Sequence, residues 1–173
     1  RRPSFPFISG DGFRSLCSHR CEEDGCAFSP LDVKDGDCIF VATTNLRTLR
    51  GTSAFIQDFA GMVDRIQSNF VVVSHNGDLS SPDGDDWHTH EESFYAEQHS
   101  YLLSNPRLLY WFASNCNWKN YPEAKPDKII CIPIGIENRY NCVGKHPEKY
   151  FSYMQKRSPI VPKKRLPFSF GPD

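Results

Sequence analysis

The stretch FVVVSHNGD, at residues 70–78, carries the clearest structural signal in the chain. It begins with four apolar residues in a row, three of them valine. A continuous β-branched run without polar alternation is typical of a strand buried on both faces, as in a parallel sheet covered by helices. In such sheets ligands bind beyond the carboxyl ends of the strands. The polar residues that follow the run are therefore candidates for a binding site.

A second stretch of the same kind, IICIPIGIENR, lies at residues 129–139. Pro133 has no backbone N–H to donate, which suits the end of a strand. Gly135 permits a positive φ or a close approach of another segment. Each loop taken alone is equally compatible with a simple turn that faces water. Two polar loops after two buried strands favour a shared site.

Apolar runs and helical spacing predict strands and helices that alternate along the chain. The expected strands lie at about 38–43, 70–74, 108–113, 129–132 and 166–170. The expected helices lie at about 12–23, 53–67, 91–103 and 147–156. This alternation predicts a mostly parallel sheet with right-handed crossovers. We therefore expect an α/β, Rossmann-like domain over residues 1–165, with residues 166–173 as its last strand or as the start of a truncated second domain.

The composition is that of an ordinary globular domain, with 39% hydrophobic and 24% charged residues in a chain of 173. The net charge of -1 provides no general attraction to nucleic acid or to an anionic membrane surface. The sequence has no 18-residue apolar stretch and no signal-peptide core, so we expect no membrane contact by this segment. Because the chain begins with Arg1 and stops at a finishing strand, we expect it to be a fragment.

Two groups of residues have the side chains of metal sites. Cys17 and Cys21 are four apart, on one face of the predicted helix, with His19 between them. The C-x₂-C spacing of common zinc modules is missing there. His88 and His90 share a face only if their segment is extended, and a solvated loop explains them better. We expect no metal at either place.

The cysteines number seven, which leaves at least one unpaired. Cys38 and Cys131 lie within apolar runs and are expected to behave as small core residues. In an oxidising compartment we expect a disulfide either within residues 17–26 or between Cys116 and Cys142.

An imidazole, an amide and a carboxylate occur close together within residues 74–78. A binuclear phosphoesterase clamps two cations with such groups. It also needs Asp and His motifs at successive strand ends, whereas the strand at 38–43 ends in Thr43-Thr44-Asn45, which supplies no carboxylate. A metal-dependent hydrolase is therefore kept only as a third hypothesis.

Three motifs together resemble the amino-terminal half of the exostosin-like glycosyltransferases, which have the glycosyltransferase B fold. They are SHNGD at 74–78, LLYWFASN at 108–115 and IPIGIEN at 132–138, and SGDGF at 9–13 fits the same pattern. The resemblance covers most of residues 7–140. It implies the acceptor-side half of an enzyme that transfers a sugar from a nucleotide-sugar donor to a glycan or glycoprotein acceptor.

In that family the carboxyl-terminal domain holds most of the donor. The resemblance therefore implies that the nucleotide sugar binds through a second domain missing from this chain, and that the chain itself holds no cofactor. It also implies a Golgi or other secretory-pathway membrane as the location, although the chain has no targeting segment. The competing hypothesis is a non-catalytic α/β module that binds a glycan or a partner.

His75 is the first candidate for a general base, because an imidazole at the cleft edge takes a proton from an acceptor hydroxyl near neutral pH. Asp78 is the second catalytic candidate and, with Asn76, would orient the acceptor. Because the strands run the same way, we expect the candidates to converge on one edge of the sheet. The remaining candidates would bind substrate along this cleft: Asn115, Gly135, Glu137, Asn138 and Arg139.

Overall fold

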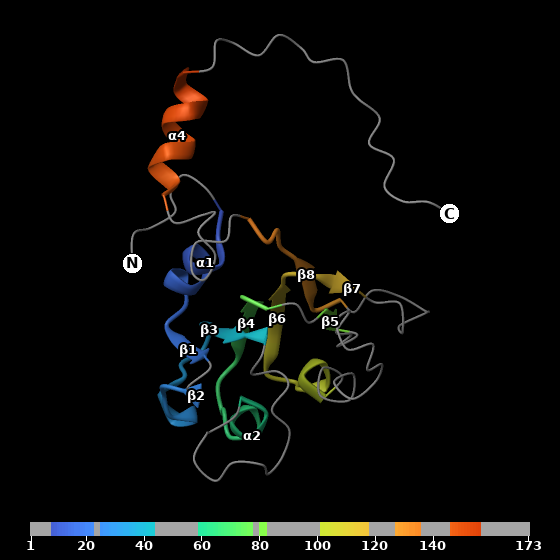
Figure 1. Ribbon diagram of the computed structural model, residues 1–173. Helices are drawn as coiled ribbons and strands as arrows, with labels where there is room; N and C mark the ends of the chain where they lie inside the picture. The colour runs from blue at the N-terminus through green and yellow to red at the C-terminus, as the bar shows by residue number, and fades with distance from the viewer. Residues whose placement is uncertain are drawn as a thin grey trace, which may run out of the picture.

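The computed structural model describes residues 8–22, 25–43, 59–77, 80–82, 101–117, 127–135 and 146–156. These residues form helices and a mostly parallel sheet (Figure 1). The coarse prediction of an α/β fold with a mostly parallel sheet is confirmed. The expected strand at 166–170 and the expected domain boundary after residue 165 lie outside the described residues.

The main sheet contains six strands. Their bounds are β1 His19–Glu22, β2 Gly25–Cys26, β3 Asp37–Ala42, β4 Phe70–His75, β6 Leu108–Ala113 and β8 Ile129–Cys131. The spatial order is β2-β1-β3-β4-β6-β8, and every neighbouring pair is parallel except the hairpin of β1 and β2. Strands β3, β4, β6 and β8 confirm four predicted strands. A separate parallel pair is formed by β5 (Ser81–Pro82) and β7 (Cys116–Asn117).

The parallel strands follow one another across the main sheet in chain order, from β1 to β8. Where an open α/β sheet binds a ligand in a crevice, the strand order reverses at that point. The described part of this sheet contains no such reversal. A site at its carboxyl edge must therefore be built by other segments.

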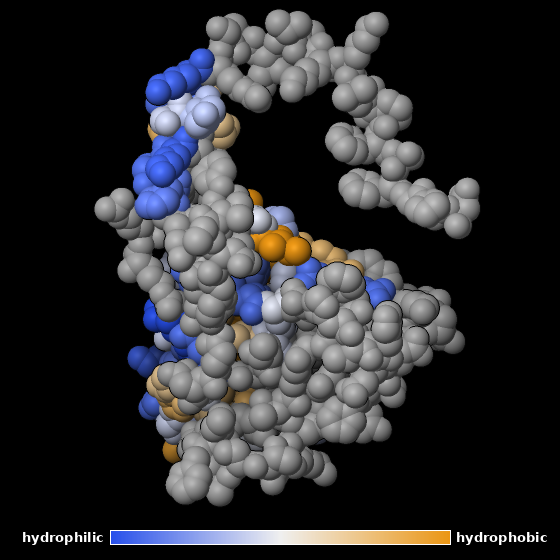
Figure 2. Space-filling view, viewed as in Figure 1, coloured by the Kyte–Doolittle hydropathy of each residue, from blue (hydrophilic) through white to orange (hydrophobic). Residues whose placement is uncertain are grey.

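The labelled helices are α1 (Gly10–Leu16), α2 (Phe59–Val63), α4 (Pro147–Lys156) and the short 3₁₀ helix η1 (Pro30–Asp32). Residues 101–104 are also helical. The prediction of a helix at 147–156 is confirmed by α4, which presents mainly hydrophilic residues in the view of Figure 2. None of the helices in the described part of the chain has the length and apolar character needed to span a membrane.

The predicted helix at 12–23 is wrong in its second half. The α1 helix ends at Leu16, and Cys17 already has an extended backbone. Residues 19–21 then pair with residues 39–41 of β3. Pairing along the sheet satisfies the backbone groups of this segment, and it outweighs the helical spacing of its cysteines.

One face of the main sheet, which we call the α2 face, carries the larger core. Ile39, Val72, Trp111 and Ile129 lie side by side in register across four strands, and all are 0% exposed. Three apolar residues from α2 and the segment after it pack against this face: Phe59, Val63 and Ile66. The alternation of side chains along each strand sends the intervening residues to the opposite face.

The opposite face, which we call the α1 face, carries a smaller core. Phe40, Val73 and Phe112 form its cross-strand row, and α1 covers them with Phe13 and Cys17. Only Cys17, Phe40 and Val73 of this described cluster are fully buried. The α1 face therefore gains less from apolar burial than the α2 face.

Three disulfides link described segments. They are Cys17–Cys38, Cys21–Cys26 and Cys116–Cys131. The Cys21–Cys26 bond lies within residues 17–26 as predicted, and it crosses the hairpin of β1 and β2. With Cys17 and Cys21 in disulfides, their thiolates are not free to ligate zinc.

The predictions for Cys38 and Cys131 as unpaired core residues are wrong, and so is the Cys116–Cys142 alternative. Cys38 lies on the α1 face, where Cys17 ends α1, so the helix brings the two sulfurs together. Cys131 is the register partner of Ala113. Ala113 lies three residues before Cys116 in the chain, so Cys116 is close enough to bond to Cys131. The apolar context of both cysteines concealed these partners.

Candidate functional site

Three segments that are distant in sequence pack together at the carboxyl edge of the main sheet. We call residues 8–10, 75–77 and 133–135 the edge cluster. A β-carbon at Gly10 would overlap Asn76 Oδ1 and lie 2.7 Å from His75 Nδ1. The close approach therefore requires glycine at this position.

The loop after β8 packs against the same amino-terminal segment. Gly135 has φ +72°, and a β-carbon there would overlap the carbonyl oxygen of Ile8 and lie 3.1 Å from the nitrogen of Ser9. Ser9 is buried and caps α1, because its hydroxyl accepts from the backbone N–H of Gly12 at 3.0 Å. The amino-terminal segment thus lies between the loops that follow β4 and β8.

His75 is the last residue of β4 and lies within the edge cluster. The residue is 4% exposed, and its ring lies on the α1 face with its centroid 5.7 Å from that of Phe13. Burial lowers the pKa of His75 below its ordinary 6.5 and outweighs the opposing effects of the Asn76 side chain and of the Pro133 and Ile134 carbonyls. The ring is therefore neutral at pH 7.

The two nitrogens of the His75 ring have different surroundings. The backbone N–H of Asn76 donates to Nδ1 at 2.8 Å, and Asn76 Oδ1 lies 3.0 Å from the same nitrogen. The carbonyls of Pro133 and Ile134 lie close enough to favour the protonated ring. Nε2, however, is buried and makes no hydrogen bond of normal geometry to any described residue.

Asn76 and Asn115 both have left-handed backbone conformations, with φ of 62° and 54°. Asparagine adopts this conformation more readily than most residues with a side chain. Asn115 follows β6, and its Nδ2 donates to the carbonyl of Gly77 at 3.0 Å. Its own carbonyl accepts from the N–H of Ser81 at the same distance. Asn115 therefore joins the loop after β4 to the loop after β6.

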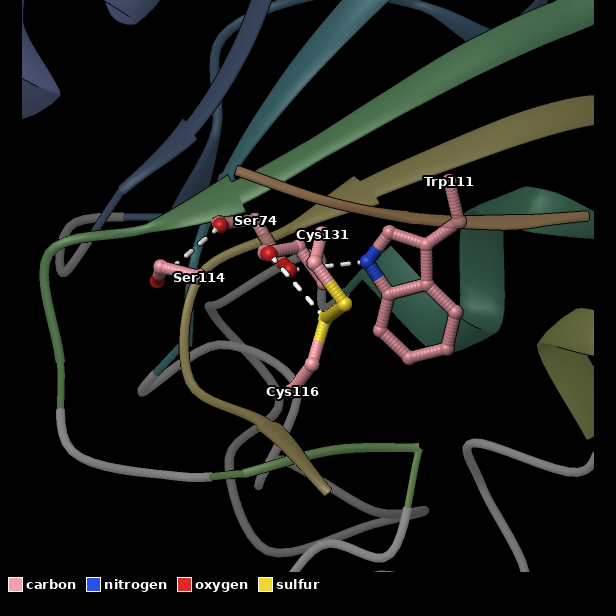
Figure 3. Close-up of a disulfide and its surroundings, with 6 residues drawn as sticks. Ser74, Trp111, Ser114, Cys116 and Cys131 are labelled. Carbon is pink, nitrogen blue, oxygen red and sulfur yellow. Dashed lines mark hydrogen bonds between the residues drawn. A yellow bond between two sulfur atoms is a disulfide. The ribbon is translucent and has the colours of Figure 1, made fainter. Parts of the chain in front are cut away.

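Beneath this edge, on the α2 face, a buried polar contact supports β4. Figure 3 shows Trp111 Nε1 donating to Ser74 Oγ, at 2.7 Å, beside the Cys116–Cys131 disulfide. The backbone N–H of Ser114 donates to the Ser74 carbonyl at 3.1 Å. These contacts hold Ser74, the residue before His75. The contact with Trp111 lies on the α2 face, opposite the side that α1 covers.

The carboxyl edge retains unused hydrogen-bonding capacity. Thr43 Oγ1, His75 Nε2 and Asn76 Nδ2 are buried without a hydrogen-bond partner among the described residues. Nearly all buried polar groups in native proteins are paired with protein or with ordered water. These atoms therefore identify the places where ordered water would complete the network.

The structure brings together part of the predicted site. His75, Asn76 and Gly135 belong to the edge cluster, and Asn115 is bonded to it through Gly77. The other candidates, Asp78, Glu137, Asn138 and Arg139, lie outside the described residues, as do His88 and His90.

Two contributions to the site were not assigned by sequence reasoning. Ser9 and Gly10 appeared only as part of a motif, and the approach of Gly10 to His75 and of Ser9 to Gly135 depends on tertiary packing. The available signal was a serine before a glycine-rich turn, which suits a helix N-cap followed by a close backbone approach.

Comparison with known proteins gives no family assignment. No family model matches this chain, and neither a curated protein nor a solved structure matches it. Within the described residues no group of three or more His, Cys, Asp or Glu side chains is arranged to hold a metal ion. The edge cluster is therefore the main structural basis for a functional proposal.

Proposed function

We propose that this chain is the acceptor-side, Rossmann-like half of a glycosyltransferase of the glycosyltransferase B fold. One observation carries the proposal. Ser9-Gly10, His75-Asn76 and Pro133-Ile134-Gly135 come from three separate motifs, yet they pack as one cluster at the carboxyl edge of a parallel sheet. A family resemblance based on short motifs gains weight when those motifs meet in space.

The chemistry of the edge suits a sugar acceptor. Sugar hydroxyls both donate and accept hydrogen bonds, and so do amide side chains such as Asn76 and Asn115. Asp78 replaces His75 as the proposed base, because His75 is 4% exposed, whereas a carboxylate next to this loop can take the proton from the attacking hydroxyl. The rest of the proposed acceptor cleft comes from Glu137, Asn138 and Arg139.

The donor in this proposal is a nucleotide sugar held by a second domain. Its diphosphate leaving group develops charge during transfer and needs preorganised donors. The proposed role of this chain is to bind and deprotonate the acceptor, with no cofactor of its own.

Paired cysteines support a secretory-pathway location. Three disulfides join six of the seven cysteines. Disulfides persist in oxidising compartments and are rare in the cytosol. The proposed site of action is the Golgi or another secretory-pathway compartment, where glycan transfer to secreted acceptors would take place.

A transfer assay tests the proposed function. The full-length protein is incubated with a panel of labelled nucleotide sugars and neutral or acidic oligosaccharides, and the product is identified by mass spectrometry. Asp78→Asn should lower kcat by about 10²–10⁴-fold, because general base catalysis is lost. Asp127→Asn, at an exposed position before β8, is the matched control and should retain activity.

A non-catalytic glycan-binding module is the second candidate, and the burial of His75 favours it. An imidazole that is 4% exposed does not meet an acceptor hydroxyl in this conformation. Oligosaccharide binding by the full-length protein without transfer from any nucleotide sugar would support this candidate. Asp78→Asn activity equal to that of wild type would contradict the assignment of the base.

A further inference from the structure

We propose that the Cys116–Cys131 disulfide is a thiol–disulfide exchange site, and that its opening by a dithiol reductant releases β8 and the loop that follows it. Cys131 is exposed and Cys116 is half-buried. The proposal rests on the proposed function only in that the loops on either side of this bond lead to the candidate acceptor residues.

The other two described disulfides are less accessible, because each contains a buried cysteine. Cys17 is buried at the end of α1, and Cys21 is buried in β1. Their partners, Cys38 and Cys26, are half-buried. Exchange requires an incoming thiolate to reach a sulfur atom, so exposed disulfides are the labile ones. A dithiol should therefore open the exposed bond first.

The bond joins the two sheets of the described structure. Cys116 lies in β7, which pairs with β5, whereas Cys131 is the last residue of β8 in the main sheet. The β8 strand has three residues and is the outermost strand on its side of the described main sheet. So short a strand has few hydrogen bonds to its neighbour, and a covalent link therefore adds substantially to its attachment.

The bond also links two groups of loops at the carboxyl edge. Asn115, directly before Cys116, donates to the carbonyl of Gly77 in the loop after β4. Gly135, in the loop that follows Cys131, packs against the amino-terminal segment. The disulfide therefore connects the loops after β4 and β6 to the loop after β8, and its opening removes the covalent part of that connection.

The dithiol supplies the electrons for the exchange. One of its thiolates attacks Cys131 Sγ, the disulfide bond breaks, and Cys116 leaves as a thiolate that takes a proton from solvent. The second thiol of the reductant attacks the mixed disulfide and releases Cys131, which is also protonated. The reductant becomes a disulfide, and two electrons reduce the cysteine pair. Cys116 Sγ lies 3.4 Å from the carbonyl oxygen of Ala113, which offers an acceptor to the new thiol.

Differential alkylation of the full-length wild-type protein tests the order of opening. The folded protein is treated with dithiothreitol, free thiols are alkylated at successive times, and the labelled peptides are identified by mass spectrometry. Cys116 and Cys131 should become labelled about tenfold faster than the other four described cysteines. Earlier opening of another bond, or opening of all three at one rate, would overturn the proposal.

Amide hydrogen exchange tests the release of β8. The backbone N–H of Ile132 donates to the carbonyl of Ala113 at 2.9 Å, so its exchange reports on the end of this strand. Opening the bond should accelerate this exchange about 100-fold, as the loop-entropy model predicts for cysteines 15 residues apart. The N–H of Gly36, which donates to Asn69 in the turn before β3, should exchange at an unchanged rate. An unchanged rate at Ile132 in the opened protein would contradict the release.

Two double variants separate this bond from general reduction. Cys116→Ser with Cys131→Ser should show fast exchange at Ile132 with or without dithiothreitol. Cys21→Ser with Cys26→Ser should keep the slow exchange at Ile132 and still respond to dithiothreitol. Slow exchange in the first variant would refute the proposal, and if that variant does not fold, the wild-type measurements still decide. None of them needs a donor or an acceptor, so their failure is distinguishable from failure of the transfer assay.

Discussion

The two faces of the main sheet are stabilised in different ways. The α2 face has a row of four fully buried residues, one from each of four adjacent strands. The α1 face has a smaller apolar cluster, and its helix is attached by the Cys17–Cys38 disulfide and by two hydrogen bonds from Arg14 to Glu22, of 2.6 and 2.7 Å. The edge cluster lies at the end of the α1 face.

This contrast indicates how the molecule accommodates a polar site. A thick apolar layer leaves little room for buried polar groups, because each of them needs a partner. On the α1 face, covalent and polar contacts replace part of that layer. His75 and Asn76 are therefore placed where packing alone does not determine the structure, and the following changes test the contrast.

The largest effect is expected on the α2 face. Trp111→Ala removes a fully buried ring and leaves Ser74 Oγ without its donor, so the free energy of unfolding should fall by about 3–5 kcal/mol. Tyr110→Ala is the control in the same strand, because Tyr110 is 50% exposed. Urea denaturation followed by circular dichroism measures both. Similar losses in the two variants would contradict the packing described for this face.

The next effect is expected from the disulfide on the α1 face. Cys17→Ser with Cys38→Ser opens a link between residues 21 apart and should cost about 3 kcal/mol by the loop-entropy model. Cys21→Ser with Cys26→Ser opens a link between residues five apart and should cost about 2 kcal/mol. Denaturation under non-reducing conditions compares the two double variants. A larger loss from the shorter link would show that this model does not describe the α1 face.

A moderate effect is expected at the edge cluster. Gly10→Ala places a methyl group against Asn76 and His75 and should cost about 2 kcal/mol through overpacking. Gly36→Ala is the control, since its β-carbon meets nothing within 4 Å and only its φ of +82° is unfavourable, at about 1 kcal/mol. The Gly10 variant alone should shift the imidazole resonances of His75. Unchanged resonances would mean that residues 8–10 do not pack there.

The smallest effect is expected from pH. Because the pKa of His75 is lowered on folding, the unfolded chain binds a proton below pH 6.5 that the folded chain does not. The stability contributed by neutral His75 is thus fully present above pH 6.5 and is lost as the pH falls through the lowered value. Urea midpoints from about pH 7.5 to 5 should fall less steeply in His75→Gln. A steeper fall in His75→Gln than in the wild type would contradict the lowered pKa.

Part of the fold could be predicted from the sequence, and part of it depends on tertiary pairing. The strand β4 is a continuous apolar run because it is covered on both faces, so its composition alone identifies it. The strand β6 is also an apolar run, although its Leu109 and Tyr110 are exposed. The strand β1 was missed because His19, Arg20 and Glu22 give it no apolar run, and only pairing with β3 makes it a strand. Cys38 was misassigned because an apolar neighbourhood does not reveal a covalent partner on a helix.

The candidate site could also be predicted in part from the sequence. Parallel strands end at one edge, and this rule places His75, Asn76 and Gly135 at the same edge of the sheet. Sequence reasoning did not give the hydrogen bond from the backbone N–H of Asn76 to Nδ1 of His75, because it depends on the left-handed backbone of Asn76. It also did not give the contact of Gly10 with that pair, because the contact depends on where α1 lies on the sheet.

The Cys116–Cys131 bond closes a ring of polypeptide around the connection from β6 to β8. A protease that cuts once anywhere between these two cysteines leaves both pieces joined in a single molecule, heavier only by one water. Such nicking is invisible on a non-reducing gel and appears as two fragments once a reductant is added.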